Sequence, residues 1–435
     1  MTAEVAIINR NAVALAADSA VTIGSQKIYN SALKLFSLSK VAPVGVMIYG
    51  NASLIDVPWE TIIKIFRESL GDKRYDSLQE YADEFFEFVR TTNNFFPESS
   101  QKAWVQRNIR GYYEFILKLL IEDIQEVIKL KGKIEESETQ VVFEECVKKR
   151  HEELNEMGLV TKITKTDEKD IRKKYQPIAK DLIKEVFQGL TPTRTIVSRL
   201  YDIAAFIHSR VVFSESTSGL VIAGYGEKEI YPSVLCHEIE GVVENKLKYK
   251  YVKDKSQTIG QGAECSIIPF AQDDMVASFM HGLNSSIQIF LVDYLNQMNE
   301  RIPDLLNPDS LSGTDEEKAQ IIDSLKNDVS QLLQKFLAQL QQHTQAEHAG
   351  PIMQMVCALP KDELAAMAES LVNLTAFKRR MTKSLETVGG PIDVAVISKG
   401  DGLVWVKRKH YFPSELNQHF FANYFRGMFN EPVKS

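Results

Sequence analysis

Two short apolar runs at the start of the chain, separated by a two-residue break, constrain its fold more than any other feature. The first run is Val5–Ile8 and the second is Ala12–Ala17, with Arg10 and Asn11 in the break. Apolar runs joined by so short a connection predict a β-hairpin. Asn11 is expected to adopt the positive φ that tight hairpin turns favour.

The register of this hairpin brings the second residue of the chain close to an acidic one. With the break forming the turn, Asn9 faces Ala12, and counting outward places Ala3 opposite Asp18. Thr2 then lies one step along from Asp18, within reach of its side chain. Removal of the initiator methionine would leave a threonine with a free α-amino group beside a buried carboxylate.

A threonine at the start of a chain has a chemistry that no internal residue has. Its hydroxyl is a weak nucleophile and needs an adjacent base. An α-amino group has a pKa of roughly 7.7 to 8.0, so part of it can accept a proton near neutral pH. Because the small residue Thr2 permits removal of Met1, the sequence predicts a hydrolase with Thr2 as its nucleophile.

Two further positions strengthen this hypothesis. Lys34 stands among small and apolar residues in a segment that predicts a partly buried strand. An unpaired buried ammonium is costly, so we expect Asp18 as its partner, and the Lys34 charge would favour the deprotonated Thr2 hydroxyl. The next apolar run, residues 44–49, ends at Gly50, where a backbone N–H can approach a substrate carbonyl as an oxyanion donor.

In order and spacing, Thr2, residues 16–19, Lys34 and Gly50 resemble the proteasome β-type subunits and the bacterial heat-shock-locus two-component peptidase. These are N-terminal nucleophile (Ntn) hydrolases. The resemblance implies an α+β fold, a four-layer αββα sandwich, here with two helical insertions. It also implies that Thr2 is the nucleophile, that Asp18 and Lys34 are its acidic and basic partners, and that Gly50 supplies the oxyanion donor.

The resemblance extends to the residues that would hold the substrate. Thr22 and Ala52 match positions whose backbone aligns the substrate in an extended conformation. Val21, Ala32 and Ile48 match positions that line the primary specificity pocket. Their apolar side chains favour cleavage after apolar residues.

Later segments agree with the family in part. Residues 220–226 resemble its central strand and residues 388–397 its last core strand. Residues 260–262 (Gly-Gln-Gly) stand where the family has a Gly-Ser-Gly turn that opens a helix. The auxiliary aspartate and serine of the family fall near Leu385 and Val388, which leaves the family's auxiliary hydrogen-bonding group missing or rebuilt. The candidates to replace them are Glu386 and Thr387.

One hydrolase core of the usual size leaves nearly half of the 435 residues unexplained. We expect core segments at 1–95, 213–295 and 353–410, helical insertions at 96–212 and 296–352, and a tail at 411–435. Apolar spacing predicts two helices within 56–92 and further helices at 315–342 and 361–381. An insertion can cover the active-site cleft, mediate self-association or form a self-contained decoration.

Composition limits the partners. A net charge of −7 gives no reason to expect nucleic acid, and the basic run from Trp405 to His410 predicts an edge strand with solvated lysines. No apolar run approaches the roughly 20 residues of a membrane span, so no membrane partner is expected. Cys146, Cys236, Cys265 and Cys357 lack C-x-x-C spacing, which favours reduced thiols and a cytoplasmic protein.

These features together predict a cytoplasmic threonine peptidase that cleaves peptide bonds through an acyl-enzyme, without metal or cofactor, as a homo-oligomer. The sequence has no Walker-type phosphate loop, so any ATP-driven unfolding of substrates would need a separate ATPase. Two alternatives remain open. One is a small-molecule amidase of the same fold, and the other is a catalytically silent scaffold that keeps Met1.

Overall fold

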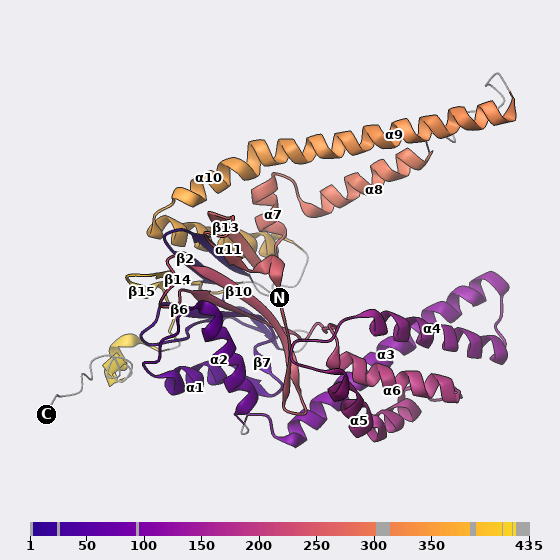
Figure 1. Ribbon diagram of the computed structural model, residues 1–435, viewed down its shortest axis with the longest axis horizontal. Coiled ribbons are helices and arrows are strands. Elements are labelled where there is room, and N and C mark those ends of the chain that lie inside the picture. Colours follow the sequence, from indigo (N-terminus) through magenta and orange to yellow (C-terminus); the bar gives the residue numbers. More distant parts are fainter. Residues whose placement is uncertain are drawn as a thin grey trace. The chain divides into compact units, whose positions relative to one another are not determined.

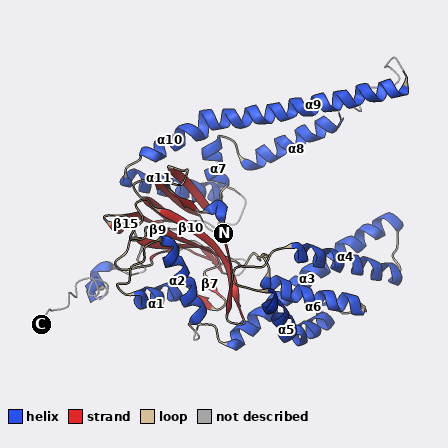
Figure 2. Cartoon of the chain, viewed as in Figure 1, coloured by secondary structure: helices blue, strands red, loops and turns tan. Residues whose placement is uncertain are grey.

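The computed structural model describes residues 3–23, 27–92, 95–301, 314–382, 389–410, 412–419 and 421–422. The chain is mixed α/β, rich in helices and with several antiparallel sheets (Figures 1 and 2). It divides into two compact units. The first consists of Met1–Ala32, Thr258–Val396 and Val404–Tyr411, and the second of Leu33–Gln257, Ile397–Leu403 and Phe412–Ser435.

The first unit is built on a five-stranded sheet with the order β13-β1-β2-β14-β15. These strands are β1 (Glu4–Asn9), β2 (Val13–Ala17), β13 (Cys265–Ala271), β14 (Asp393–Ser398) and β15 (Gly402–Lys407). Strand β1 pairs antiparallel with both β2 and β13, so the first strand of the chain lies inside the sheet. The short strands β3 (Val21–Ile23) and β4 (Lys27–Tyr29) form a separate antiparallel pair.

The predicted register of the first hairpin is confirmed. Glu4 pairs with Ala17 and each later residue of β1 with the corresponding earlier residue of β2. At the two ends, the Asn9 N–H donates to the Ala12 carbonyl and the Asp18 N–H donates to the Ala3 carbonyl, both at 3.1 Å. Ala3 therefore lies opposite Asp18, as the count from the turn predicts.

The expected conformation of the turn is wrong in one respect. Asn11 is not among the described residues with positive φ. Instead the side-chain carbonyl of Asn9 accepts the N–H groups of Asn11 at 2.9 Å and Ala12 at 3.2 Å. An asparagine whose side chain accepts the backbone N–H two residues later stabilises a turn without a residue of left-handed conformation. The turn is therefore stabilised by the side chain of Asn9 and not by a positive φ at Asn11.

Helices cover one face of this sheet. They are α7 (Asp274–His281), α10 (Gly350–Ala358) and α11 (Lys361–Met381), and α11 coincides with the helix predicted at 361–381. Its buried residues recur at helical spacing, among them Leu364, Ala368, Leu371 and Val372. They pack against alternate residues of β1 and β2 in one apolar cluster.

A helical hairpin belongs to the same unit. It consists of α8 (Ser285–Arg301) and α9 (Asp315–Thr344), which contact each other and run side by side in Figure 1. The predicted helix at 315–342 is thus confirmed, and a π-helical turn, η4 (Gln345–Ala349), connects α9 to α10. Thr314 begins α9 with a capping box to Glu317.

Among the described residues, no single helix has the length and apolar character needed to cross a membrane. The bent pair of Asp274–His281 and Ser285–Arg301 would meet those criteria together, by length and composition alone.

The expectation of four reduced thiols is wrong for two of them. Cys265 of β13 and Cys357 of α10 form a disulfide, with Cα atoms 5.1 Å apart. The two residues are 92 positions apart in the sequence, and only the packing of α10 beside β13 brings them together. Cys146 and Cys236 are buried free thiols.

The second unit contains an antiparallel sheet with the order β11-β10-β9-β6-β5 and the short strand β12 beside β10. Its strands are β5 (Leu35–Ser37), β6 (Val44–Gly50), β9 (Ser218–Gly224), β10 (Ser233–Val243), β11 (Lys246–Tyr251) and β12 (Gln257–Thr258). A small pair, β7 (Ser53–Leu54) and β8 (Val57–Pro58), follows β6, and η1 (Lys253–Lys255) and η5 (Ser414–Leu416) are single 3₁₀ turns.

Two helices cover one face of this second sheet. They are α1 (Trp59–Leu70) and α2 (Leu78–Thr91), and they confirm the two helices predicted within 56–92. Ser77 begins α2 by accepting the Glu80 N–H. Aromatic and aliphatic side chains of both helices form one apolar cluster with alternate residues of β5, β6 and β9.

Four helices between β8 and β9 have a core of their own. They are α3 (Glu98–Lys131), α4 (Glu136–Glu156), α5 (Lys165–Val186) and α6 (Arg194–Ser209). Their buried apolar side chains form a cluster that also includes Val243 at the end of β10. The helical patterning seen in this stretch of the sequence is therefore confirmed.

A buried ion pair joins α4, α5 and the end of α6. The Arg210 guanidinium contacts both carboxylate oxygens of Glu168, at 2.8 and 3.1 Å. It also donates to the backbone carbonyls of Leu154, Asn155 and Met157 at the end of α4. The Arg210 side chain is 2% exposed, so these partners replace the water that its charge has lost.

We expect Arg210→Ala to destabilise the protein by about 3–5 kcal/mol, because it leaves the Glu168 carboxylate buried without its partner. Urea unfolding would measure the loss. Arg194→Ala, on the exposed first turn of α6, is the control and should change the free energy of unfolding by less than about 0.5 kcal/mol. Equal effects of the two substitutions would contradict this account.

A second buried titratable group lies under α2. His237 of β10 packs against Phe86 and Tyr251, with ring centroids at 4.7 and 5.4 Å, and its Nδ1 has no hydrogen-bond partner among the described residues. Burial lowers the pKa of His237 from 6.5 to about 4. The folded protein therefore keeps this imidazole neutral where an unfolded chain would protonate it.

His237→Phe is expected to reduce the loss of stability between pH 6.5 and pH 5. With the folded pKa at about 4, the unfolded state binds more protons in that window, so stability is complete above pH 6.5 and falls as the pH drops. One such histidine costs about 2 kcal/mol at pH 5. Urea unfolding of both proteins at pH 7 and pH 5 measures the difference, and an identical loss in both would be the contrary result.

Candidate active site

The carboxylate of Asp18 organises the end of the first hairpin. Asp18 follows β2 directly and is fully buried. Its Oδ1 accepts the Ala3 N–H at 3.2 Å, and its Oδ2 accepts the Gly389 N–H at 2.9 Å and, more weakly, the Ala20 N–H at 3.4 Å. The Ala3 nitrogen belongs to the peptide bond with Thr2, so the carboxylate is fixed one residue from the predicted nucleophile.

The loop after Asp18 is tied to the segment that precedes β14. The Ser19 N–H donates to the Gly389 carbonyl at 3.1 Å, and the Ser19 hydroxyl donates to the Pro391 carbonyl. Gly390 has a φ of +78°, and a Cβ on it would lie 2.7 Å from that of Asn30. A glycine is therefore required where the two segments meet.

Sequence reasoning missed a buried ion pair beside this loop. The Lys409 Nζ lies 2.9 Å from the Asp393 Oδ2 and also donates to the Ser19 hydroxyl, while the Lys409 N–H donates to the Asp393 Oδ1 at 2.8 Å. The side chains of Lys409 and Asp393 are only 10% and 1% exposed.

The prediction that the lysines after Trp405 are solvated is therefore wrong for Lys409, although β15 is an edge strand as expected. The available signal was Asp393, an acidic residue inside an apolar run, which needs a buried partner.

Lys34 is buried, as predicted, but lies directly before β5 rather than within a strand. Its carbonyl accepts the Ile48 N–H at 2.9 Å, which fixes its backbone beside β6. Lys34 belongs to the second unit and Asp18 to the first. Their expected pairing remains a prediction.

Gly50 ends β6, where it pairs with Ser218 of β9. Its φ is +76°, and a Cβ at this position would lie 2.5 Å from the Thr217 carbonyl oxygen. The following N–H, of Asn51, donates to that same oxygen at 3.2 Å. Both the backbone conformation and the lack of space therefore require glycine here.

Three of the predicted substrate-binding residues belong to the first unit. Val21 begins β3 and is half-buried, and Thr22 pairs with Ile28 through its backbone. The side chain of Thr22 lies outside the described residues. Ala32 is half-buried and its N–H donates to the Ser19 carbonyl at 3.1 Å, which places it beside the Asp18 loop.

The other two predicted substrate-binding residues, Ile48 and Ala52, belong to the second unit. Ile48 is buried in the apolar cluster under α1 and α2. Ala52 is exposed, and its carbonyl accepts the Trp59 N–H at 3.0 Å at the start of α1. Thr2, Leu385, Glu386, Thr387 and Val388 lie outside the described residues.

The prediction for the Gly-Gln-Gly turn is wrong. Gly260 and Gly262 have φ of +88° and +89°, as a tight turn requires, but the turn leads into strand β13. The helix begins only at Asp274, after that strand. Residues 265–271 carry the alternating burial of a strand on the edge of the first sheet, which the spacing of glycines alone does not reveal.

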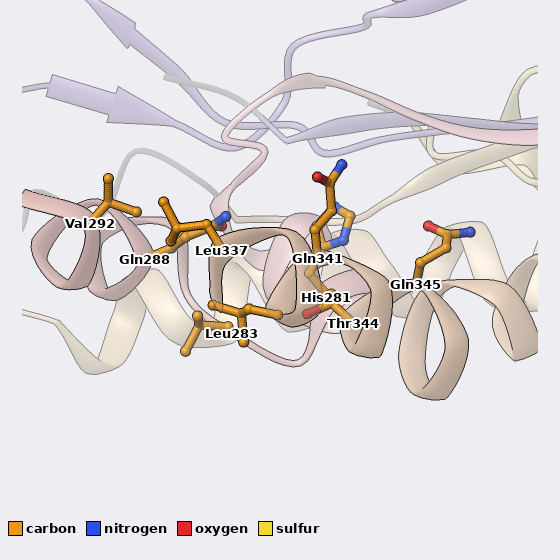
Figure 3. A pocket seen from close by; sticks show the side chains of 9 residues that line it. His281, Leu283, Gln288, Val292, Leu337, Gln341, Thr344 and Gln345 are labelled. Carbon is orange, nitrogen blue, oxygen red and sulfur yellow. The ribbon is translucent and has the colours of Figure 1, made fainter. Parts of the chain in front are cut away.

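Cavities occur in both units. In the second unit a cavity of about 910 Å³ lies next to Asn51, between α3 and residues 207–216. In the first unit a cavity of about 440 Å³ lies between α7–α8 and α9 (Figure 3). Among the residues lining the latter, only His281 is titratable, so this cavity lacks the pair of groups that acid–base catalysis needs.

No protein-family model matches this chain, and no curated protein matches it either.

Gly50→Ala is expected to lower the free energy of unfolding by about 1–3 kcal/mol, because alanine must adopt a left-handed φ and displace the Thr217 carbonyl. Gly111→Ala is the matched control. Gly111 lies within α3, where an added Cβ meets nothing within 4 Å, so alanine should stabilise the helix by about 0.5–1 kcal/mol. Urea unfolding would measure both, and effects of the same sign would contradict the analysis of Gly50.

Proposed function

We propose that this protein is an Ntn hydrolase that cleaves peptide bonds with Thr2 as its nucleophile after removal of Met1. The observation that carries the proposal is the buried Asp18 carboxylate, which accepts the N–H of Ala3, the residue after Thr2. The observed β1–β2 register places Ala3 opposite Asp18, which supports the proposal.

In the proposed reaction the Thr2 hydroxyl attacks the substrate carbonyl and passes its proton to the Thr2 α-amine. The Gly50 N–H donates to the oxyanion of the tetrahedral intermediate. As the intermediate collapses, the α-amine returns the proton to the leaving amine and an ester to Thr2 remains. Water then attacks the ester, with the α-amine as base, and releases the acid. Asp18 and Lys34 hold and tune the nucleophile.

The proposed architecture is a four-layer αββα sandwich. Each sheet has helices on one face and apolar residues on the other. On the second face the first sheet carries Ala6, Ile8 and Leu15, and the second sheet carries Met47 and Val221. Two apolar sheet faces each need a covering layer, and each can supply it to the other.

Intact mass spectrometry of protein purified from its own cells, with and without a β-lactone electrophile, tests the proposal. We expect a mass without Met1 and a single adduct. Thr2→Ser should keep the adduct because it retains a hydroxyl behind a removable methionine, and Thr2→Ala should lose it. A retained Met1 without adduct would contradict the proposed function and favour the scaffold alternative.

A further inference from the structure

The cavity of about 910 Å³ in the second unit has a wall of aromatic side chains. The aromatic wall consists of Trp104, Tyr112 and Phe115 from α3 and Phe213 from the segment after α6. Its volume lies in the range of cavities that bind whole small molecules or several residues of a peptide. Aromatic side chains supply large contact areas at low entropic cost.

Polar groups are interleaved with the aromatic wall. Asn51, Asn108, Ser214 and Ser216 line the same cavity and offer amide and hydroxyl groups. Arg107 also lines it, and its guanidinium lies 3.6 Å from the Asp56 carboxylate. Neutral donors and acceptors beside aromatic rings suit a peptide, whose backbone needs hydrogen bonds and whose side chains need apolar contacts.

A buried ion pair fixes one side of the cavity. Glu240, which lines the cavity, contacts the Lys248 ammonium, and its Oε1 accepts the Ser214 N–H at 2.8 Å. The Lys248 Nζ also donates to the carbonyls of Ile207 at 2.6 Å and Val212. The segment 207–214 is therefore held in place by the core sheet, which lowers the cost of ordering it on binding.

The backbone beside the cavity is strained at Ile55. This lining residue has a φ of +55°, which is rare for a β-branched side chain. Ile55 is the first residue of the two-residue turn between β7 and β8, and such a hairpin turn favours a positive φ at this position.

We propose that this cavity binds an extended peptide segment with aromatic or large aliphatic side chains, namely the part of the substrate next to the cleaved bond. This inference rests on the proposed function. Gly50 is the proposed oxyanion donor, and Asn51, the next residue, lines the cavity. Because Asn51 directly follows Gly50, a peptide bound in the cavity would lie next to the end of β6 that carries the proposed oxyanion donor.

The test uses the Thr2→Ala protein, in which no cleavage can occur. Two fluorescein-labelled peptide amides serve as probes, one alternating phenylalanine and leucine and the other alternating serine and glycine. Fluorescence anisotropy should show binding of the first and at least tenfold weaker binding of the second. Phe115→Ala should raise the Kd of the first peptide about tenfold, because it removes the ring that contacts the aromatic side chains of the peptide.

Ile121→Ala is the matched control. Ile121 lies on the same helix, outside the cavity, and is 47% exposed against 45% for Phe115. Its substitution should leave the Kd within twofold. Because both side chains are on the surface, neither substitution threatens the fold.

Equal binding of the two peptides, or an unchanged Kd in Phe115→Ala, would overturn the assignment of the cavity. Failure of the proposed function has a different signature, since it appears as the absence of the β-lactone adduct at Thr2. An adduct with no Phe115-dependent binding removes the cavity proposal alone. Phe115-dependent binding without an adduct shows that the cavity binds peptide, and it overturns both the hydrolase and the assignment of the cavity to the substrate beside the cleaved bond.

Discussion

The candidate site in the first unit depends on one buried carboxylate and the backbone N–H groups that donate hydrogen bonds to it. Asp18 joins the start of β1, through Ala3, to the segment before β14, through Gly389. A buried carboxylate is tolerated only where hydrogen bonds replace the water it has lost. The three parts of the chain that meet there, at Ala3, Asp18 and Gly389, are therefore held in one arrangement.

The sheet order fixes the backbone beside the proposed site. Chain termini usually fray unless a strand ties them down. Here β1 has partners on both sides, β13 and β2, so its backbone is paired along both edges. The pair of Lys409 and Asp393 then fixes Ser19 from the far end of the same sheet. Residues from both ends of the sequence thus support one loop.

Features set by neighbouring residues could be predicted from the sequence, whereas contacts between distant segments could not. The hairpin register came from counting outward from a two-residue turn, and α11 from apolar residues at helical spacing, because both are set by local periodicity. The disulfide of Cys265 with Cys357 and the contact of Lys409 with Ser19 join distant segments, and no spacing encodes them. Of these residues, only Asp393 indicated such a contact in the sequence, because a charged side chain in an apolar strand needs a buried partner.

The proposed division of labour follows from where each group is anchored. Asp18 is held by backbone groups of the first sheet, whereas the aromatic wall belongs to α3 and the segment after α6, fixed to the second sheet by Lys248. Changes in α3 can therefore alter what the cavity accepts without moving Asp18. Since Asn51 directly follows Gly50, the two functions would meet only at the end of β6. An inserted helical segment at this place would change specificity and leave the chemistry intact.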